Sequence, residues 1–477
     1  MEINENLHVV IGLEMHCELK SQSKVFSTGK NSYSDTANEN ISPVDMAFPG
    51  ILPVLNKYSV EEAIKMAHIL NCNIADYMIF DRKHYYYPDL PKGYQITQCT
   101  RPIGVNGYIE YDLNNEIKKA YITDIHLEED AASLDHMHNT STIDYNRAGV
   151  PLLEVVTEPC FRSADEALAF LENMIKIYQY TDISDADTKR GQVRCDVNVS
   201  LANEKDEYVT PRAEVKNVNS LSNIYNAILF EEKRQRDAYF NHTEELVQET
   251  RRYDEETNTT IRMRTKVDAI DYKYFVEPNI PPYKIEKDLI DKLIKDIPEL
   301  PYSRKLRYLN DYNLSLEDAN TLIKNRYLSD YFDECINIGI DTSSAANWVT
   351  VNILGELNKD NSSIKDFYIT PIYLKEIIDA IKNGSISSKQ AKEIFNKSIN
   401  NKKEPKEYLS DYSQISDESY LKDLINNIIN NNQEQRQAYL NGKSNLFDYF
   451  VGQVMKETKG KANPTITKEL LNELLNK

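Results

Sequence analysis

The stretch Val9-Val10-Ile11-Gly12-Leu13-Glu14-Met15-His16 is an apolar run that ends in a carboxylate and an imidazole. Such a run predicts a β-strand over 8–13 that leads into the polar residues. Because residues two apart on an extended chain face the same side, Glu14 and His16 should point together. A carboxylate inside an apolar strand is costly unless it is paired or bound to a metal. The stretch therefore predicts either a buried ion pair or a metal site within a sheet.

Four later segments place charged residues on predicted strands in the same way. They contain Glu128, Glu129 and Asp130 (125–130), Glu154 (151–156), Arg194, Asp196 and Asn198 (193–199), and Glu214 with Lys216 (212–216). Strands of this kind, if they converge, supply the oxygen ligands and the one imidazole that suit Mg²⁺, and phosphoryl transfer from a nucleotide is a natural function for such a site. The same alternation is also typical of any half-exposed antiparallel strand, and the exceptions are Glu14 and Glu154, which lie within apolar runs.

The first 280 residues predict an α+β fold with mainly antiparallel strands, because the predicted strands are separated by long insertions without a repeating βαβ order. The expected strands are 8–13, 120–125, 191–201 and 212–218, and the expected helices are 60–70, 163–180 and 221–240. Ser163 and Glu166 form a capping-box pattern at the start of the second helix. The third helix carries dense charges from Glu231 to Arg236, and we expect it to be largely exposed.

A cluster of prolines between 278 and 301 marks a domain boundary. Beyond it nearly every apolar pattern is helical, over 373–381, 388–399, 421–429, 447–457 and 466–475. A further break at 400–405 divides this half. The length and these breaks predict three parts: a catalytic cradle domain at 1–290, an all-helical domain at 291–404 and a helical tail at 405–477.

The composition excludes several classes of protein. The net charge of the 477 residues is −19, which argues against coating nucleic acid or membrane by bulk electrostatics and leaves room for a local basic groove. The sequence has no apolar run of the roughly 18–20 residues that a membrane span needs, and its six cysteines include no CxxC pair. It also lacks a GxxxxGK[ST] loop, a GxSxG elbow and an HExxH pair. We expect a reduced cytoplasmic protein.

Taken together, the segments resemble the GatB family, which comprises the B subunits of the bacterial aspartyl/glutamyl-tRNA amidotransferase. The matching segments follow the family's order and are VIGLEMH (10–16), PGILPVLN (49–56), FDRK (80–83), YPDLPKGYQI (87–96), HLEEDA (126–131), NRAGVPLLE (146–154), RCDVN (194–198), EVKN (214–217), DYKYF (271–275) and KGKANP (459–464). The tail over 405–477 resembles a YqeY-like module.

The resemblance implies an enzyme that amidates a misacylated tRNA. Members of the family use ATP and Mg²⁺ to phosphorylate the side-chain carboxylate of Glu-tRNA(Gln) or Asp-tRNA(Asn), and ammonia then displaces the phosphate. They work as a heterotrimer with a Ser-Lys amidase, which releases ammonia from glutamine, and with a small linking protein. No ammonia-releasing motif is found in this sequence, which agrees with that division of labour.

The match also implies roles for individual residues. The implied metal group is Glu14, His16, Glu128, Glu129 and Glu154, and the implied nucleotide-binding residues are Lys83, Arg194 and Lys216. The candidate catalytic residues are Glu14, His16, Glu128, Glu154, Asp196, Glu214 and Lys216.

One segment departs from the family. Many relatives carry CxC and CxxC pairs after the first strand, forming a zinc site, whereas this chain reads Phe26-Ser27-Thr28-Gly29 and Ile41-Ser42-Pro43-Val44-Asp45 at those places. Structural zinc usually needs four Cys or His ligands, so we expect no zinc and a loop held by packing alone.

The tail is the part of the chain that we expect to bind the body of the tRNA. Residues 401–477 contain 11 basic and 11 acidic side chains, so the charge of −19 lies entirely on 1–400. The neutral tail is therefore the surface least repulsive to a polyanion, and Lys456, Lys459 and Lys461 lie close to Gly460 within it. The alternative for the tail is a helical bundle that packs on the core or on a partner protein.

Two other functions remain open at this point. The chain could be a non-catalytic tRNA-binding scaffold, against which the apolar context of Glu14 and Glu154 argues. It could also be an ATP-dependent enzyme that activates the carboxylate of a free small molecule, although a long helical C-terminal half suits a large substrate better.

Overall fold

The computed structural model of the protein describes residues 6–114, 116–137, 140–218, 220–265, 271–360, 362–412, 418–458 and 460–476. Contacts between Cα atoms divide the chain into two compact units, 1–303 and 304–477. The predicted division at 290 and 404 into three parts stays a prediction. Lys459, which is expected in a basic turn, lies outside the described residues.

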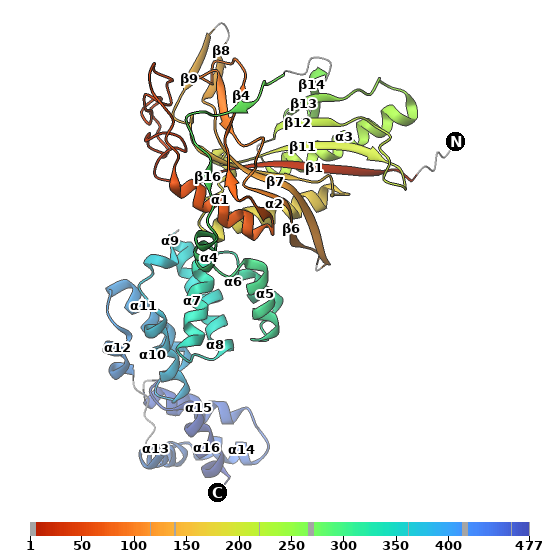
Figure 1. Ribbon diagram of the computed structural model, residues 1–477. Coiled ribbons are helices and arrows are strands. Elements are labelled where there is room, and N and C mark those ends of the chain that lie inside the picture. Colours follow the sequence, from red (N-terminus) through yellow and green to blue (C-terminus); the bar gives the residue numbers. More distant parts are fainter. Residues whose placement is uncertain are drawn as a thin grey trace. The chain divides into compact units, whose positions relative to one another are not determined.

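A nine-stranded sheet forms the framework of the first unit, in the order β14-β13-β12-β11-β1-β10-β7-β6-β2 (Figure 1). Its strands are β1 (His8–Glu18), β2 (Asn73–Ile74), β6 (Gly104–Leu113), β7 (Glu116–Glu129), β10 (Pro151–Thr157), β11 (Val193–Ala202), β12 (Ala213–Val218), β13 (Glu249–Asp254) and β14 (Thr259–Thr265). Every pair of neighbours is antiparallel except β12 and β13. The predicted α+β fold with mainly antiparallel pairing is confirmed.

Smaller sheets complete the first unit. A three-stranded sheet contains β15 (Phe275–Val276), β4 (Asp81–His84) and β5 (Tyr94–Thr97). Two two-stranded sheets pair β3 (Tyr77–Met78) with β16 (Tyr283–Lys284) and β8 (Ser133–Met137) with β9 (Thr140–Asp144). Strand β5 contacts β7, which brings the three-stranded sheet beside the centre of the large one.

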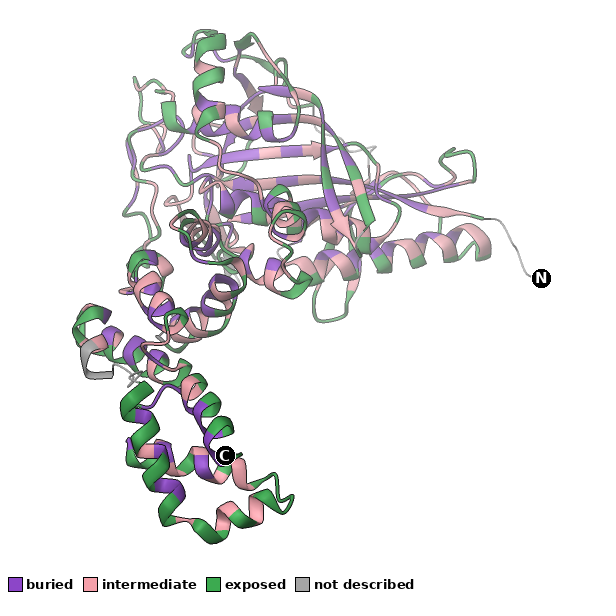
Figure 2. Ribbon diagram, turned by 90° about the horizontal axis from the view of Figure 1, so that it is seen from below, coloured by how far each residue is buried: buried purple, intermediate pink, exposed green. Residues whose placement is uncertain are grey.

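One face of the large sheet is apolar and the other is polar. In β1 the side chains of Ile11, Leu13 and Met15 are buried in the hydrophobic core, whereas Glu14 and His16 alternate with them and face the other way. Helices α1 (Lys57–Ile69), α2 (Ala164–Tyr180) and α3 (Leu221–Asn241) contribute apolar side chains to the same core. The central strands β1, β10 and β11 are largely buried (Figure 2), so charged side chains on their polar face are costly unless they are paired or bind a cation.

The start of α2 follows the predicted cap only in part. Ser163 Oγ accepts a hydrogen bond from the backbone N–H of Glu166 at 3.1 Å, as expected of an N-cap. The Glu166 carboxylate accepts from the backbone N–H of Arg162 at 2.7 Å, one residue before the position that a capping box uses. The helix therefore begins where the sequence predicts, and Glu166 accepts from a different backbone amide than a capping box requires.

The expectation that α3 is largely exposed is wrong for one of its faces. Ile224, Ala227 and Ile228 are buried in the core, and Glu231 is fully buried. Glu231 pairs with Arg234 of the same helix at 2.7 Å and with Arg251 of β13 at 3.1 Å. A charge run in a sequence does not reveal a basic partner on a distant strand, and such a partner allows the charge to be buried.

The segment that takes the place of the family's zinc loop is not held by packing alone, as we expected. The ammonium group of Lys24, which is fully buried, lies 3.3 Å from the Asp45 carboxylate. Asp45 also accepts hydrogen bonds from Ser27 Oγ at 2.7 Å and from the backbone N–H of Ser42 at 2.8 Å. Burial lowers the pKa of the Lys24 ammonium, and Asp45 opposes that shift. The absence of zinc stays a prediction.

The second unit is helical, as predicted. Its helices begin with α5 (Pro301–Asn310), which crosses the boundary, and continue as α6 (Leu316–Leu322), α7 (Arg326–Asn337), α8 (Thr342–Asn347), a π-helical turn (Trp348–Ile353), α9 (Leu354–Asp360), α10 (Pro371–Lys382), α11 (Ser388–Asn401), α12 (Pro405–Tyr412), α13 (Glu418–Asn431), α14 (Gln433–Leu440), α15 (Leu446–Glu457) and α16 (Pro464–Leu475). Helix α4 (Lys287–Lys295) precedes them in the first unit.

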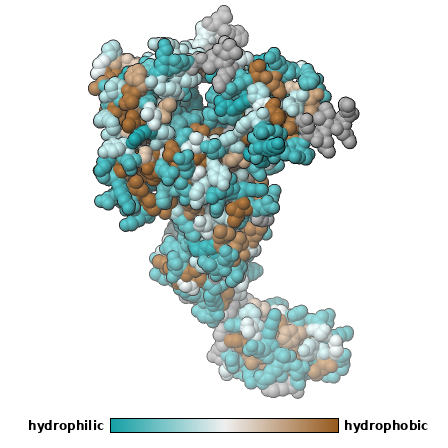
Figure 3. All heavy atoms as spheres, turned by 45° about the vertical axis from the view of Figure 1, so that its right-hand side comes forward, coloured by the Kyte–Doolittle hydropathy of each residue, from teal (hydrophilic) through white to brown (hydrophobic). Residues whose placement is uncertain are grey.

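Two apolar clusters lie within this helical unit. The first includes Phe332, Trp348 and Phe395, and the second includes Leu421 and Phe450. Among the described residues, no helix is long and apolar enough to cross a membrane. On the face drawn in Figure 3, hydrophobic residues appear in patches among hydrophilic ones.

Candidate functional site

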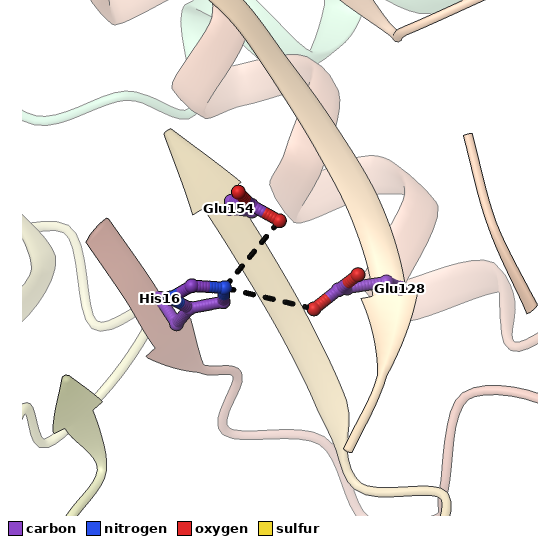
Figure 4. Close-up of side chains that lie close together, drawn as sticks. All are labelled: His16, Glu128 and Glu154. Atoms are coloured by element: carbon purple, nitrogen blue, oxygen red, sulfur yellow. Dashed lines mark ion pairs between the residues drawn. The ribbon is translucent and has the colours of Figure 1, made fainter. Parts of the chain in front are cut away.

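Three neighbouring strands at the centre of the sheet bring His16, Glu128 and Glu154 together (Figure 4). His16 of β1 pairs with Glu154 of β10, and Glu128 of β7 pairs with Leu152 of β10. The Nε2 atom of His16 lies 3.4 Å from a Glu154 oxygen and 3.9 Å from a Glu128 oxygen. The three residues offer ligand atoms that all lie within 4.8 Å of one another. We call this group the histidine set.

A second group forms on the other side of β1. Glu14 pairs across the strands with Asp196 of β11, and Glu214 of β12 lies opposite Asn198. The carboxylates of Glu14, Asp196 and Glu214 also lie within 4.8 Å of one another. Lys216 Nζ lies 2.8 Å from both Asp196 and Glu214 and holds the two together. We call this group the carboxylate set.

The structure therefore divides the predicted metal group of five residues. Glu14 and His16 share a face, as predicted, but they belong to different sets, because each faces a different neighbouring strand. Glu129 joins neither set. It directly follows Glu128 on β7, so its side chain points away from the face that carries Glu128. There it pairs with Lys92 and accepts a hydrogen bond from the backbone N–H of Ile96 at 2.9 Å.

Burial and crowding shift the titration of the histidine set. Burial raises the pKa of Glu128, and the Glu154 charge adds to the rise. Burial also opposes ionisation of Glu154, yet His126 and His16 hold its pKa well below the usual value. Burial alone would lower the pKa of His16, but Glu154 and Glu128 raise it to about 9. The clustered carboxylates thus favour positive charge at the site. A bound divalent cation can provide that charge in place of a proton.

The carboxylate set has the same character. Burial raises the pKa of Glu14, and the charges of Glu154 and Asp196 add to the rise against a hydrogen bond from Asn198. That bond joins Asn198 Nδ2 to a Glu14 oxygen at 2.9 Å. Burial would lower the pKa of Lys216, but Asp196 and Glu214 raise it. Oxygen ligands with imidazole nitrogen nearby form a donor set that fits Mg²⁺ or Mn²⁺.

Two further residues of the site, His126 and Asp124, were not predicted from the sequence. His126 Nε2 lies 2.9 Å from a Glu154 oxygen, and its Nδ1 lies 2.8 Å from Asp124 Oδ1. The signal was available, because Asp124, His126 and Glu128 alternate along β7 and therefore share a face. His126 therefore links Asp124 to Glu154 of the histidine set.

The predicted nucleotide-binding residues differ in their surroundings. Lys83 of β4 reaches the site from the three-stranded sheet: burial would lower its pKa, but Glu128, Tyr274 and Glu154 raise it. Arg194 donates to Asp130 Oδ2 at 2.6 Å, so its guanidinium already has a carboxylate partner. Lys216 is engaged by the carboxylate set.

A cleft of about 330 Å³ opens beside the carboxylate set. Its charged lining consists of Glu14, Lys83, Arg212, Glu214, Lys216, Glu249 and Arg264. Cations and carboxylates facing one cavity suit a ligand that brings both a polyanion and a metal ion, such as a nucleotide polyphosphate with Mg²⁺.

Comparisons with known proteins place this site within a described domain. Residues 9–291 match the model of the GatB/GatE catalytic domain, and residues 330–475 match that of a second domain described as the GatB domain. The chain is 43% identical over 474 residues to the aspartyl/glutamyl-tRNA(Asn/Gln) amidotransferase B subunit of Oceanobacillus iheyensis, with 99% of each chain covered. It is 43% identical over 475 residues to the protein of the same name from Halalkalibacterium halodurans, covering 99% of this chain and 100% of the relative. Its identity to that of Brevibacillus brevis is 42% over 471 residues, with 98% of each covered.

Proposed function

The chain belongs to the GatB family of aspartyl/glutamyl-tRNA amidotransferase B subunits, and from this premise we propose that it catalyses the ATP-dependent amidation of a misacylated tRNA. The substrates are Glu-tRNA(Gln), Asp-tRNA(Asn) or both. The observation that carries the proposal is the pair of adjacent ligand sets on the polar face of the sheet, both within the residues that match the catalytic-domain model.

The proposed reaction has two steps. A side-chain carboxylate oxygen of the aminoacyl group forms a bond to the γ-phosphorus of ATP as the bond to ADP breaks. Ammonia then forms a bond to the activated carbon, phosphate departs, and the nitrogen releases one proton to leave the amide. Because the nucleophile and the phosphates are all anionic, the first step requires strong charge neutralisation.

Mg²⁺ fits both sets, and when bound it would neutralise charge on the transferred phosphoryl group. The histidine set of His16, Glu128 and Glu154 and the carboxylate set of Glu14, Asp196 and Glu214 are the residues that would hold it. Lys83, Arg212 and Arg264 line the adjoining cleft and place positive charge where the phosphates would lie. Lys216 positions Asp196 and Glu214 by pairing with both.

We further propose two protein partners, the amidase and the small linking protein of the heterotrimeric amidotransferase. The sequence contains no nucleophile set for glutamine, so ammonia must come from another chain. It must also arrive uncharged, because ammonium has no lone pair with which to attack. We propose that the tail over 405–477 binds the body of the tRNA. Within it, Lys456 and Lys461 lie on either side of Gly460 in the sequence and offer positive charge to phosphates.

Reconstitution tests this function directly. The chain, assembled with the amidase and the small linking protein, is given glutamine, ATP and Mg²⁺ with either Glu-tRNA(Gln) or Asp-tRNA(Asn). The proposal expects amide formation with at least one of them, and dependence on both ATP and the metal. If neither tRNA is amidated while the amidase still hydrolyses glutamine, the proposal is wrong.

A further inference from the structure

A threonine on the strand next to the carboxylate set makes a hydrogen bond to one of its members. Strand β13 runs parallel beside β12 (Figure 1) and places Thr250 directly opposite Glu214. The Thr250 hydroxyl donates to Glu214 Oε2 at 3.0 Å. Thr250 is only 8% exposed, so water competes little for this bond.

The two oxygens of Glu214 are held by two different partners. Lys216 Nζ lies 2.8 Å from Oε1, and the Thr250 hydroxyl bonds to Oε2. A carboxylate offers about four lone-pair sites, so both oxygens keep capacity for a cation. The partners differ in charge, because the ammonium competes with a metal ion for the carboxylate whereas the hydroxyl is neutral. The Thr250 hydroxyl therefore fixes the orientation of Glu214 without neutralising it.

Strand β13 is itself fixed by a network of buried charges. Glu249 and Arg251 flank Thr250 in the sequence, and both pair with residues of α3. Glu249 lies 3.0 Å from Arg234, and the two strand residues pair with each other at 2.9 Å. Arg251 lies 3.1 Å from Glu231, which is fully buried. Because breaking a buried ion pair is costly, this network gives the strand, and with it the Thr250 hydroxyl, a fixed position.

We propose that Thr250 is a positioning residue, which holds Glu214 in the orientation in which the carboxylate set binds a divalent cation. The inference rests on the proposed metal site and adds a residue that acts on the site through Glu214. Without the hydroxyl, Lys216 is the strongest remaining partner of Glu214. The carboxylate then turns toward the ammonium, and the metal ion loses part of a ligand.

The experiment measures Mn²⁺ affinity of the reconstituted complex by electron paramagnetic resonance, with no nucleotide or tRNA present. Thr250→Val keeps the β-branched shape and removes the hydroxyl, whereas Thr250→Ser keeps a hydroxyl. Thr250→Ala repeats the loss with a smaller side chain, in case the valine variant does not fold. Thr123→Val is the matched control, because the Thr123 hydroxyl donates to Glu158, outside both ligand sets, at 2.9 Å. Thermal unfolding of each variant shows whether it is folded.

A second arm separates positioning from direct contact with the ion. Thr250→Val is combined with Glu214→Ala, and the two single variants and the double variant complete a thermodynamic cycle. If the hydroxyl acts through Glu214, its loss has no effect once the Glu214 carboxylate is gone. If it contacts the ion itself, the two losses add.

We expect Thr250→Val to bind Mn²⁺ about tenfold more weakly, at the lower end of the usual effect of losing such a partner. Thr250→Ser and Thr123→Val should bind it as tightly as the wild type, and Thr250→Val should add nothing to Glu214→Ala. Wild-type affinity in folded Thr250→Val or Thr250→Ala, failure of the serine to restore affinity, or additive losses in the cycle would each overturn the positioning role. A wild-type complex that binds no Mn²⁺ would instead refute the metal site of the proposed function.

Discussion

The imidazole of His126 lies 2.9 Å from a carboxylate oxygen of Glu154, on the strand next to the one that carries Glu154. Its other nitrogen lies 2.8 Å from Asp124, so the ring is held from both sides. Groups that orient a metal-binding carboxylate in this way act on the affinity for the metal without binding it themselves.

We therefore predict that His126→Ala weakens Mn²⁺ binding about 10- to 100-fold, the usual effect of losing such a partner. Titration of the complex with Mn²⁺, followed by electron paramagnetic resonance, measures this affinity. His68→Ala provides the matched control, because His68 is an exposed histidine of α1. Equal Mn²⁺ affinity in wild type and His126→Ala would show that the contact does not orient Glu154.

The two ligand sets lead to a second prediction. Glu14→Ala removes a member of the carboxylate set and Glu128→Ala a member of the histidine set. Each should lower tRNA-dependent ATP hydrolysis by about a hundredfold or more, because charge neutralisation at the transferred phosphoryl group is lost. Glutamine hydrolysis by the partner should persist. Glu110→Ala, at an exposed carboxylate of β6, should retain full activity. Near-normal ATP turnover in both site variants would place the metal elsewhere.

The convergence of carboxylates could be predicted from the sequence because β-strands alternate strictly. That rule places Glu14 and His16 on one face, and Arg194, Asp196 and Asn198 on the polar face of β11. It does not give register between strands. For this reason the sequence could not show that Glu14 faces Asp196 while His16 faces Glu154, nor that the group divides into two sets.

Contacts between distant segments were harder to predict than local structure. Nothing near Lys24 in the sequence indicates that its partner is Asp45. The charge run in α3 predicts a solvent-exposed face, because the sequence does not show that Arg251 of β13 pairs with Glu231. Glu129 is a different case, because simple alternation separates it from Glu128, and only the match to the family grouped the two.

The buried pair of Lys24 and Asp45 is expected to stabilise the segment that follows β1. Removing one partner leaves an uncompensated buried charge, so Lys24→Met should cost about 3–5 kcal/mol in the free energy of unfolding. Replacing both, as Lys24→Met with Asp45→Asn, should cost less than the sum of the two single changes. Urea denaturation of the four proteins measures the cycle. Additive losses would mean that the two charges do not stabilise each other.

The helical tail gives a prediction about affinity for tRNA. Deleting the residues after Asn401 should weaken tRNA binding strongly and flatten its dependence on salt, because phosphate contacts release counterions. Filter binding at several salt concentrations measures both quantities. Glutamine hydrolysis without tRNA should be nearly unchanged, since that chemistry is proposed to lie on another chain. A truncated complex with the full-length affinity and salt slope would show that the tail does not bind tRNA.

The central claim is that the side-chain carboxylate is phosphorylated, and the fate of its oxygen atoms tests this most directly. Glu-tRNA(Gln) labelled with oxygen-18 in the side-chain carboxylate is incubated with the reconstituted complex, ATP, Mg²⁺ and glutamine, and the released phosphate is examined by mass spectrometry. If the carboxylate attacks the γ-phosphorus and ammonia later displaces phosphate, each amide formed transfers one labelled oxygen to phosphate. Amide formation with unlabelled phosphate would contradict the account, because ATP would then be cleaved without phosphorylating the substrate.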